Sequence, residues 1–427
     1  MGWMHATSSK ILIAVHATGR VAFCRMNMRT TCILGMAALL SCTKAGNAPS
    51  RTPEAQAKAD AYVTRIEQRL AATPEDAGIR YCLCTAYDDA GRVSDALTCL
   101  EALDARGWPV SIRANDFHES PSTPEFQTLF RRSNEREVRV NRSHLAFTAP
   151  AQLVPENVAF DPKSGAFFLG SVAERKIVRV AGGRVSDFGN SGNLTPPLLS
   201  IVGMKVDAAR RTLWAASEGG PSPKPRRSEL LLFDIDRGEL LHRFAPDDGD
   251  PHLFNDVVVS SQEDVFITDS VGGGVYRVSA RGALRALVPG GAFPHANGIA
   301  LSRDEKKLFV AYDVGIAVVD PQTGAHADLR NESSRSIAGI DGLYARGDEL
   351  VAVQNNIGRA RVVRIRLDAE GTRARDVEYL ESGHPLFGDP APTTGVLVGD
   401  QFYYIANFQL QLSRPLEDVQ VLVLSLP

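Results

Sequence analysis

NGIALSRDEKKLFVAYDVGIAVV, residues 297–319, is the stretch that decides the fold of this chain. It begins with a turn dipeptide and a short apolar strand, continues through the polar loop SRDEKK, and then gives two more apolar strands, LFVAY and GIAVV. Short apolar runs bounded by glycine, aspartate and other turn residues are typical of β-strands, and no helical period runs through them. The stretch therefore predicts one small sheet of consecutive strands.

The same order of strands occurs six times towards the C-terminus. The first strands begin with ENVAFD at 156, VGMKVD at 202, NDVVVS at 255, NGIALS at 297, DGLYAR at 341 and TGVLVG at 394. The second strands keep the same register and read FFLGS, LWAAS, VFITDS, LFVAYD, LVAVQN and YYIAN. A period of roughly 40 to 50 residues is that of propeller blades. We therefore expect an all-β six-bladed β-propeller over residues 140–427, with Leu145–Pro150 as the outer strand that closes the ring.

Composition narrows the classes of partner. The chain has 47 Lys and Arg against 50 Asp and Glu, so it has no overall positive field for nucleic acid or for an anionic membrane surface. The cysteines all precede residue 100, at positions Cys24, Cys32, Cys42, Cys82, Cys84 and Cys99. A metal site in the propeller must therefore use oxygen or nitrogen ligands.

The N-terminal segment has the pattern of an export signal. Basic Arg29 precedes an apolar run, Ile33–Leu40, which is far shorter than the roughly 20 residues that span a bilayer. The tetrad Leu-Leu-Ser-Cys that ends at Cys42 resembles the bacterial lipobox, in which the cysteine is lipidated and becomes the new N-terminus. We therefore expect residues 1–41 to be a lipoprotein signal peptide. An ordinary secretory signal cut nearby is the alternative.

Two further expectations concern this segment. Residues before Met26 or Met28 fit neither a signal nor a fold, which suggests that one of these methionines is the true start. Thr43 rather than aspartate follows the cysteine, and by resemblance this favours the outer membrane. We expect a protein of the bacterial cell envelope on the periplasmic side, held by its lipid anchor alone, with residues 42–54 as a polar tether.

Residues 55–135 carry helix signals and predict a small all-α module. Ala55–Ala71 spaces its apolar residues three to four apart, as one amphipathic helix does. The following segment resembles one tetratricopeptide repeat through Leu83, Tyr87, Gly91, Ala96, Leu100 and Leu103. We expect a turn around Pro124–Phe130 to complete the module. Its role stays open between a docking surface for a protein partner and a cap packed on the propeller.

Three cysteines, Cys82, Cys84 and Cys99, lie on these predicted helices. In an oxidising periplasm one pair could form a disulfide, and an isolated buried thiol is equally compatible with the pattern. The spacing does not give the connectivity.

Aligning the six blade starts gives one column of residues: Glu156, Val202, Asn255, Asn297, Asp341 and Thr394. The first strand of a blade lines the central channel, so these positions are expected to face a common axis. Carboxylate and amide oxygens suit a hard cation such as Ca²⁺, whereas the absence of histidine and cysteine argues against zinc. Singly, each residue is an ordinary turn or surface residue, and the shared register is what favours a metal site.

This Glu-Asn-Asn-Asp pattern, with the phrases NGIALS, DGLY and ITDS around it, resembles the senescence marker protein/gluconolactonase/luciferin-regenerating enzyme-like family, also called the regucalcin family. The resemblance implies a metal-dependent hydrolase of lactones or phosphotriesters, with a divalent cation on the propeller axis. By position it implies Glu156, Asn297 and Asp341 as metal ligands, and Asn255 as a ligand or substrate contact. It also makes Asp341 the candidate general base or nucleophile.

Two residues depart from the family pattern. Leu253 stands where the sugar-lactone members carry an arginine, which weakens the case for a sugar-acid lactone. Asn157 stands where a glycine is expected after the first glutamate, and it could change the shape of the channel mouth.

Four further residues are candidates for the surroundings of the site. His252 and His295 precede two of the predicted ligands closely, so they could act as bases or substrate contacts, although loop histidines are more often bonded to the backbone. Asp269 and Asp313 end two second strands and could hydrogen-bond the ligands.

Taken together, these patterns predict a lipid-anchored envelope protein whose propeller binds calcium and hydrolyses a small ester, lactone or phosphoester. The alternative is a non-catalytic binding or scaffold propeller with the helical module as its protein-interaction surface. In a third reading the metal is purely structural. A fold alone does not decide between them.

Overall fold

The computed structural model describes residues 51–427, apart from 109–110, 221–226, 280–281, 388–391 and 410–415. The predicted signal peptide, Cys42, the two candidate start methionines and most of the tether lie outside the described residues. None of the described helices is long and apolar enough to cross a membrane.

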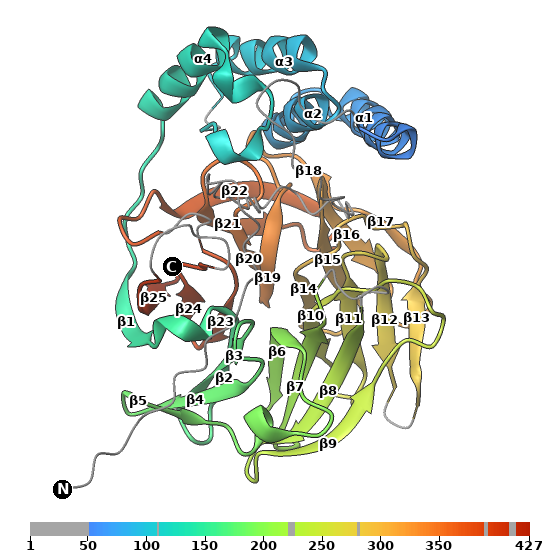
Figure 1. The fold of residues 1–427 in the computed structure, drawn as a ribbon, viewed down its shortest axis with the longest axis vertical. Coiled ribbons are helices and arrows are strands. Elements are labelled where there is room, and N and C mark those ends of the chain that lie inside the picture. Colours follow the sequence, from blue (N-terminus) through green and yellow to red (C-terminus); the bar gives the residue numbers. More distant parts are fainter. Residues whose placement is uncertain (1–50, 109–110, 221–226, 280–281, 388–391, 410–415) are drawn as a thin grey trace, which may run out of the picture.

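Six sheets surround a common centre and confirm the predicted six-bladed β-propeller (Figure 1). Blade 1 consists of β2 (Pro155–Asp161), β3 (Ala166–Ser171), β4 (Ile177–Ala181) and β5 (Arg184–Asp187). Blade 2 consists of β6 (Ser200–Asp207), β7 (Thr212–Glu218), β8 (Ser228–Asp234) and β9 (Glu239–Phe244). Blade 3 consists of β10 (Phe254–Val259), β11 (Val265–Asp269), β12 (Gly274–Val278) and β13 (Leu284–Val288).

The remaining blades follow in chain order. Blade 4 consists of β14 (Ile299–Leu301), β15 (Leu308–Tyr312), β16 (Gly315–Val319) and β17 (His326–Asp328). Blade 5 consists of β19 (Ile340–Arg346), β20 (Glu349–Gln354), β21 (Arg361–Leu367) and β22 (Arg373–Ser382), with the short β18 (Arg330–Asn331) at its outer edge. Blade 6 consists of β23 (Gly395–Val398), β24 (Gln401–Ile405), β25 (Val419–Ser425) and β1 (His144–Ala149). Short 3-10 turns are η1 (Ala114–Asp116), η2 (Ser120–Ser122), η3 (Ala151–Leu153) and η4 (Ser191–Asn193).

The strand predicted to close the ring does so. β1 pairs antiparallel with β25, with His144 opposite Val423 and Ala149 opposite Val419. Because β1 precedes blade 1 and β25 ends blade 6, this pairing joins the two ends of the propeller and covers the outer edge of the last sheet. Between the blades, facing apolar side chains such as Phe168, Ile201 and Phe233 are fully buried and form the core.

Above blades 4 and 5 lies the helical module, made of α1 (Pro53–Ala72), α2 (Ala77–Asp89), α3 (Val93–Ala105) and α4 (Pro124–Glu135) (Figure 1). α1 begins two residues before the predicted start because Thr52 caps it, accepting a hydrogen bond from the backbone N–H of Ala55 at 3.2 Å. Pro53 suits its first position. Gly91, with φ +76°, makes the predicted turn between α2 and α3.

One helix was not expected. The segment predicted as a turn is the start of α4, because Thr123 caps the helix and Pro124 opens it. Phe126 and Leu129, three residues apart, then bury one face against the other helices. Short polar segments with proline can thus start a helix as well as a turn.

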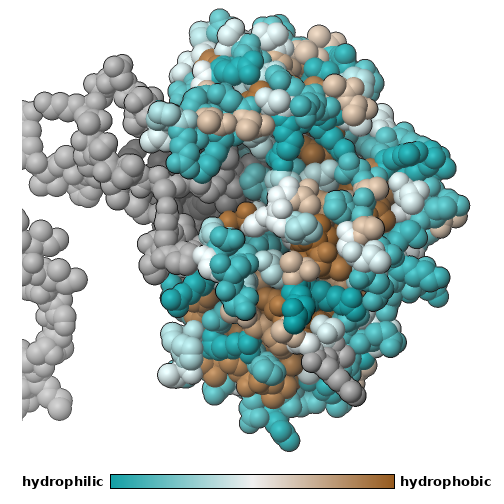
Figure 2. Space-filling model, turned by 90° about the vertical axis from the view of Figure 1, so that its right-hand side faces the viewer, coloured by the Kyte–Doolittle hydropathy of each residue, from teal (hydrophilic) through white to brown (hydrophobic). Residues whose placement is uncertain are grey.

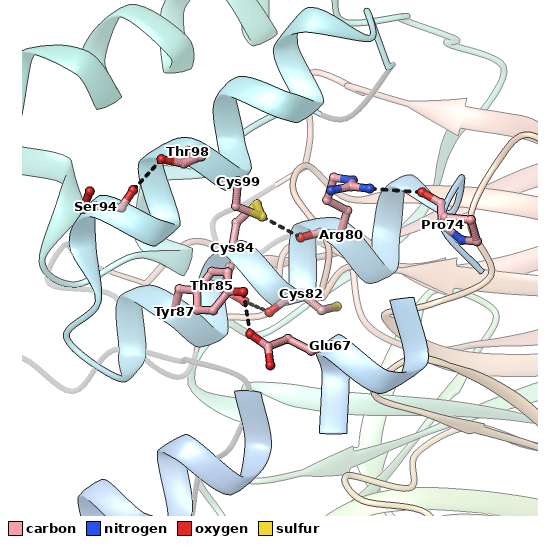
Figure 3. Close-up of a disulfide and its surroundings, with 10 residues drawn as sticks. All are labelled: Glu67, Pro74, Arg80, Cys82, Cys84, Thr85, Tyr87, Ser94, Thr98 and Cys99. Carbon is pink, nitrogen blue, oxygen red and sulfur yellow. Dashed lines mark hydrogen bonds between the residues drawn. A yellow bond between two sulfur atoms is a disulfide. The ribbon is translucent and has the colours of Figure 1, made fainter. Parts of the chain in front are cut away.

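A disulfide between Cys84 and Cys99 joins α2 to α3 (Figure 3). Their Cα atoms are 5.3 Å apart, a separation at which a disulfide forms readily. Cys82 is a buried thiol outside the bridge, with its sulfur directed away from it (Figure 3) and 3.9 Å from the backbone carbonyl of Asp313. Among the three cysteines of the described helices, the structure therefore contains one bridge and one buried thiol outside it.

The module packs on the propeller rather than standing apart from it. One continuous buried cluster includes Ile66 and Leu83 of the helices together with Phe293, Tyr312 and Ile357 of blades 4 and 5. Figure 2 shows the side of the molecule where the module, at the top, carries mainly hydrophilic residues, and the larger apolar patches lie lower, over the propeller. The module turns its apolar face inwards, as the cap interpretation expects.

Candidate functional site

The predicted column falls at one structural feature of the innermost strands. Four of these strands have a shift of register, a β-bulge, at their start. The bulges contain Glu156 in blade 1, Val202 in blade 2, Asn255 in blade 3 and Asp341 in blade 5. A bulge leaves an extra residue outside the ladder and changes the direction of its side chain.

The two other blades place their column residues just before the ladder. In blade 4 the backbone N–H of Asn297 bonds the carbonyl of Ala311 at 2.9 Å. In blade 6 the carbonyl of Thr394 accepts from Ile405 at 3.1 Å. All six positions therefore lie at the start of the innermost strands, and these strands surround the centre of the ring (Figure 1).

Asp341 is the most strongly held member of the column. Its Oδ2 accepts hydrogen bonds from Asn355 Nδ2 at 2.6 Å and from Thr393 Oγ1 at 2.9 Å, and Asn297 bonds the same carboxyl group. Burial raises the pKa of Asp341, while these three hydrogen bonds oppose the rise. The structure thus brings Asn297 and Asp341 together, as the register predicts.

Three amide oxygens in the same region have no donor. The Oδ1 atoms of Asn157, Asn297 and Asn355 are buried and accept no hydrogen bond from the described residues. A buried acceptor without a donor costs about 1 to 3 kcal/mol, so these three, which belong to column residues or to their immediate neighbours and partners, call for an explanation. A cation satisfies such oxygens as well as a donor does, and carbonyl oxygens beside a carboxylate are ligands that Ca²⁺ prefers. The residues present therefore fit a hard cation.

The other two predicted ligands are arranged differently. Asn255 Nδ2 donates to Ser270 Oγ at 3.0 Å, which ties this side chain to its own blade. Glu156 is half-exposed, and its backbone carbonyl accepts from Thr394 Oγ1 at 2.7 Å. In the described part of the chain, no three histidine, cysteine, aspartate or glutamate side chains converge on one point. A cation here would therefore depend on amide oxygens more than on carboxylates.

Sequence reasoning missed a charged group one step further along the innermost strands. Asp256 accepts hydrogen bonds from the backbone of Val257 at 2.9 Å and of Ile299 at 3.2 Å. Burial raises the pKa of Asp256 to about 6, while Lys205 lowers it and Asp341 raises it. Burial lowers the pKa of Lys205, and Asp256 opposes that effect. Asp256 lies in the same β-bulge as Asn255. Recognising that two residues fall in this bulge would have added Asp256 to the column.

His252 is locked into a network of its own in blade 3. Its Nδ1 lies 2.6 Å from Asp269 Oδ2 and its Nε2 lies 2.8 Å from Asp248 Oδ1. Burial alone would lower the pKa of His252, but the hydrogen bonds with the two carboxylates outweigh it and raise the pKa to about 9. The raised pKa favours the charged imidazole at neutral pH, and both nitrogens are engaged by carboxylates, an arrangement that does not suit a general base.

Asp269 does not contact the predicted ligands either. Its Oδ1 accepts from the backbone N–H groups of Leu253 at 2.9 Å and Gly272 at 2.9 Å, and its Oδ2 contacts His252. The carboxylate thus fixes the loop before β10 rather than the Asn255 side chain. Leu253, the departure from the family pattern, is itself buried.

His295 and Asp313 lie beneath α1. The ring of His295 makes an edge contact with Tyr62, with centroids 6.2 Å apart. Asp313 Oδ2 pairs with Arg65 at 2.5 Å. Burial raises the pKa of Asp313 to about 6, with Arg65 opposing the rise. Sequence analysis assigned both residues to the surroundings of the site, but it gave no sign that a helix some 230 positions earlier in the chain would cover them.

Comparisons with known proteins give likenesses of structure only. No family model and no curated protein matches the chain. A PQQ-bound aldose sugar dehydrogenase from Streptomyces coelicolor is 16% identical, with a TM-score of 0.46 over 67% of this chain and 99% of its own. A gluconolactonase from Xanthomonas campestris is 14% identical, with a TM-score of 0.46 over 68% of this chain and 100% of its own.

A third solved structure, a luciferin-regenerating enzyme, is 14% identical, with a TM-score of 0.46 over 67% of this chain and 95% of its own. Gluconolactonase-type and sugar-dehydrogenase-type propellers are thus both among the structures similar to this chain. At these identities and TM-scores the likeness says nothing of ligand or reaction. The chemistry has to be argued from the residues at the axis.

Proposed function

We propose that the axis site binds a calcium ion and hydrolyses a small ester, lactone or phosphoester. The observation that carries the proposal is the set of buried amide oxygens without donors. Asn297 and Asn355, which bond the carboxylate of Asp341, have two of them, and Asn157, which bonds Thr394, has the third. Asp341, Asn297 and Asn355 would hold the ion, and Glu156 and Asn255 stand at equivalent places in blades 1 and 3. A bound calcium ion would polarise the carbonyl or phosphoryl oxygen of a substrate.

The chain's own residues support this chemistry in two ways. Asn355 and Thr393 bind one oxygen of Asp341 and so fix the orientation of its carboxylate, which is the candidate for directing a water molecule. Lys205 and Asp256 place a positive and a negative charge deeper along the same strands. Glu156 and Asn297 retain part of their exposure although the core of the blades around them is buried, which supports access of solvent to the axis.

A direct test uses the protein without residues 1–42. We expect Ca²⁺ to raise its melting temperature in a concentration-dependent way, and Asp341→Asn to abolish that rise. Asp400→Asn is the matched control, because Asp400 lies in a turn of blade 6 with its side chain 83% exposed. No calcium-dependent shift in the unmodified protein would refute the cation site, and the hydrolase proposal would fail with it.

Activity is a separate question. A panel of lactones, aryl esters and phosphotriesters should include a substrate whose hydrolysis requires Ca²⁺ and is lost in Asp341→Asn. Calcium binding without hydrolysis of any member would favour a non-catalytic binding propeller.

We also propose that the protein is lipidated at Cys42 and held on the periplasmic side of the cell envelope. The disulfide between Cys84 and Cys99 supports this, because such bridges persist in oxidising compartments. Mass spectrometry of the membrane-extracted protein should find a lipid-modified Cys42 as its first residue. A soluble mature protein that begins elsewhere would show an ordinary secretory signal instead.

A further inference from the structure

We propose that the helical module holds the two loops that carry Asn297 and Asp341, and that Arg65 and Asp313 are positioning residues for the axis site. The inference rests on the proposed calcium site. It gives the module a function within the chain, beyond covering the propeller.

Asp313 lies at the junction of the two loops. Its backbone N–H donates to the carbonyl of Pro294 at 3.2 Å, three residues before Asn297. Its own carbonyl accepts from the N–H of Gly339 at 3.3 Å, two residues before Asp341. A single residue at the end of β15 therefore bonds the approach to both candidate ligands.

The side chain of Asp313 connects this junction to α1. Its carboxylate is almost completely buried, with 2% of the side chain exposed, and it pairs with Arg65 at 2.5 Å. Arg65 lies 4.9 Å over the ring of Tyr62, which in turn contacts His295 of the Pro294 loop. A buried carboxylate that loses its cation is strongly destabilised, so Arg65 fixes the position of Asp313.

Helix α2 contacts the loop before Asp341 directly. A Cβ atom on Gly78 would lie 2.1 Å from Ser336 Oγ, so the helix backbone touches the loop and only glycine fits there. The carbonyl of Gly339 in this loop accepts from the N–H of Asn355 at 3.2 Å. The side chain of Asn355 then bonds Asp341, which completes a continuous path from the helices to the candidate ligand.

Helix α1, which carries Arg65, also provides an internal control. Arg69, one turn after Arg65, pairs with Asp328 at the end of the outer strand β17. Both ion pairs join α1 to blade 4, but the Arg69 pair lies at the outer strand β17, and Arg69 acts on Asp313 only through a weaker electrostatic interaction than that of Arg65. If the module were only a cap, the loss of either arginine would have the same consequence.

The experiment compares Arg65→Ala with Arg69→Ala in the protein without residues 1–42. Calcium affinity is measured by calorimetry, and amide hydrogen exchange is followed in peptides that cover the loops before Asn297 and Asp341. We expect Arg65→Ala to weaken calcium binding about tenfold and to speed exchange in both loops, as the loss of a residue that orients ligands does. Arg69→Ala should leave both quantities close to those of the unmodified protein.

Arg65→Lys keeps the charge and should recover part of the lost affinity. If Arg65→Ala does not fold, Gly78→Ala serves as the second variant, because it displaces the loop at Ser336 from the other helix. Equal effects of the two arginine variants on both measurements would overturn the proposal. If the unmodified protein binds no calcium, the proposed function fails, and the exchange of the two loops still decides whether the module holds them.

Discussion

Two polar clusters occupy the same face of the propeller and differ in how well their atoms are satisfied. In blade 3, His252 lies between Asp269 and Asp248, and both of its ring nitrogens are engaged. At the axis between blades 4 and 5, Asp341 is bonded by Asn355, yet the buried Oδ1 of Asn355 has no donor. The first cluster is complete in itself, whereas the second contains a buried acceptor without a donor.

The difference gives a way to separate structure from function in this fold. A charged network whose members satisfy one another stabilises the chain and gains nothing from a ligand. A network with buried acceptors that lack donors can form additional favourable interactions with a bound ion or ligand. Variants in the blade 3 cluster should therefore affect stability, and variants at the axis should affect binding.

The largest effect is expected from Asp341→Asn. The substitution keeps the shape of the side chain and removes the carboxylate that Asn297 and Asn355 bond, each of which has a buried amide oxygen without a donor. Calcium affinity, measured by calorimetry, should fall on the order of 100-fold or more, since loss of a ligand exceeds the 10 to 100-fold cost of losing a residue that orients one. An affinity close to that of the unmodified protein would show that the ion, if bound, lies elsewhere.

His252→Gln tests the other side of the comparison. It leaves the buried Asp269 without its charged partner, which should lower the free energy of unfolding by about 2 to 3 kcal/mol in urea denaturation. Calcium affinity should stay within twofold of the original. His242→Gln, at an exposed position of β9, is the matched control and should change neither quantity. A loss of calcium binding in His252→Gln would show that the blade 3 cluster and the axis cluster form one site.

The blades and the register of the column could be predicted from the sequence. The repeat of apolar strands predicts six blades and places Asn297 and Asp341 in one register, because strand period and turn residues are local signals. The same repeat predicts that residues before the first blade close the ring, as β1 does.

The satisfaction of polar atoms is not local, and the sequence could not supply it. The sequence shows that a polar residue, Asn355, ends the second strand of blade 5. Its bond to Asp341, however, depends on how β20 pairs with β19. Asp256 was not predicted because a β-bulge adds a residue to the strand, and a strict alternation of inward and outward side chains does not allow for it. His252 and Asp313 differ from expectation for the same reason, since their partners come from a neighbouring loop and from α1.

Asn355→Ala and Asn407→Ala sharpen the comparison at equivalent places. Both asparagines follow a second strand, but Asn407 is satisfied, donating to the carbonyl of Asp418 and accepting from the N–H of Gln420. We expect Asn355→Ala to weaken calcium binding about tenfold. Asn407→Ala should instead cost about 1 to 2 kcal/mol of stability and leave the affinity unchanged. The opposite pattern would mean that unmet amide oxygens do not mark the ligand site.

The smallest effect is a dependence of stability on pH. The pKa of His252 is raised to about 9 in the folded protein, against roughly 6.5 for an unfolded histidine, so its contribution is complete below about pH 6.5 and is lost as the pH rises through about 9. Asp89, whose pKa burial raises to about 7, changes stability in the same direction, but most of its titration lies below pH 7.5. Between about pH 7.5 and 9.5 the free energy of unfolding should therefore fall by about 1 kcal/mol, a figure reduced because Asp248 is partly exposed to solvent. His252→Gln should flatten this slope and His242→Gln should retain it. A slope that survives in His252→Gln would assign the titration to another group and leave the blade 3 network without its charge.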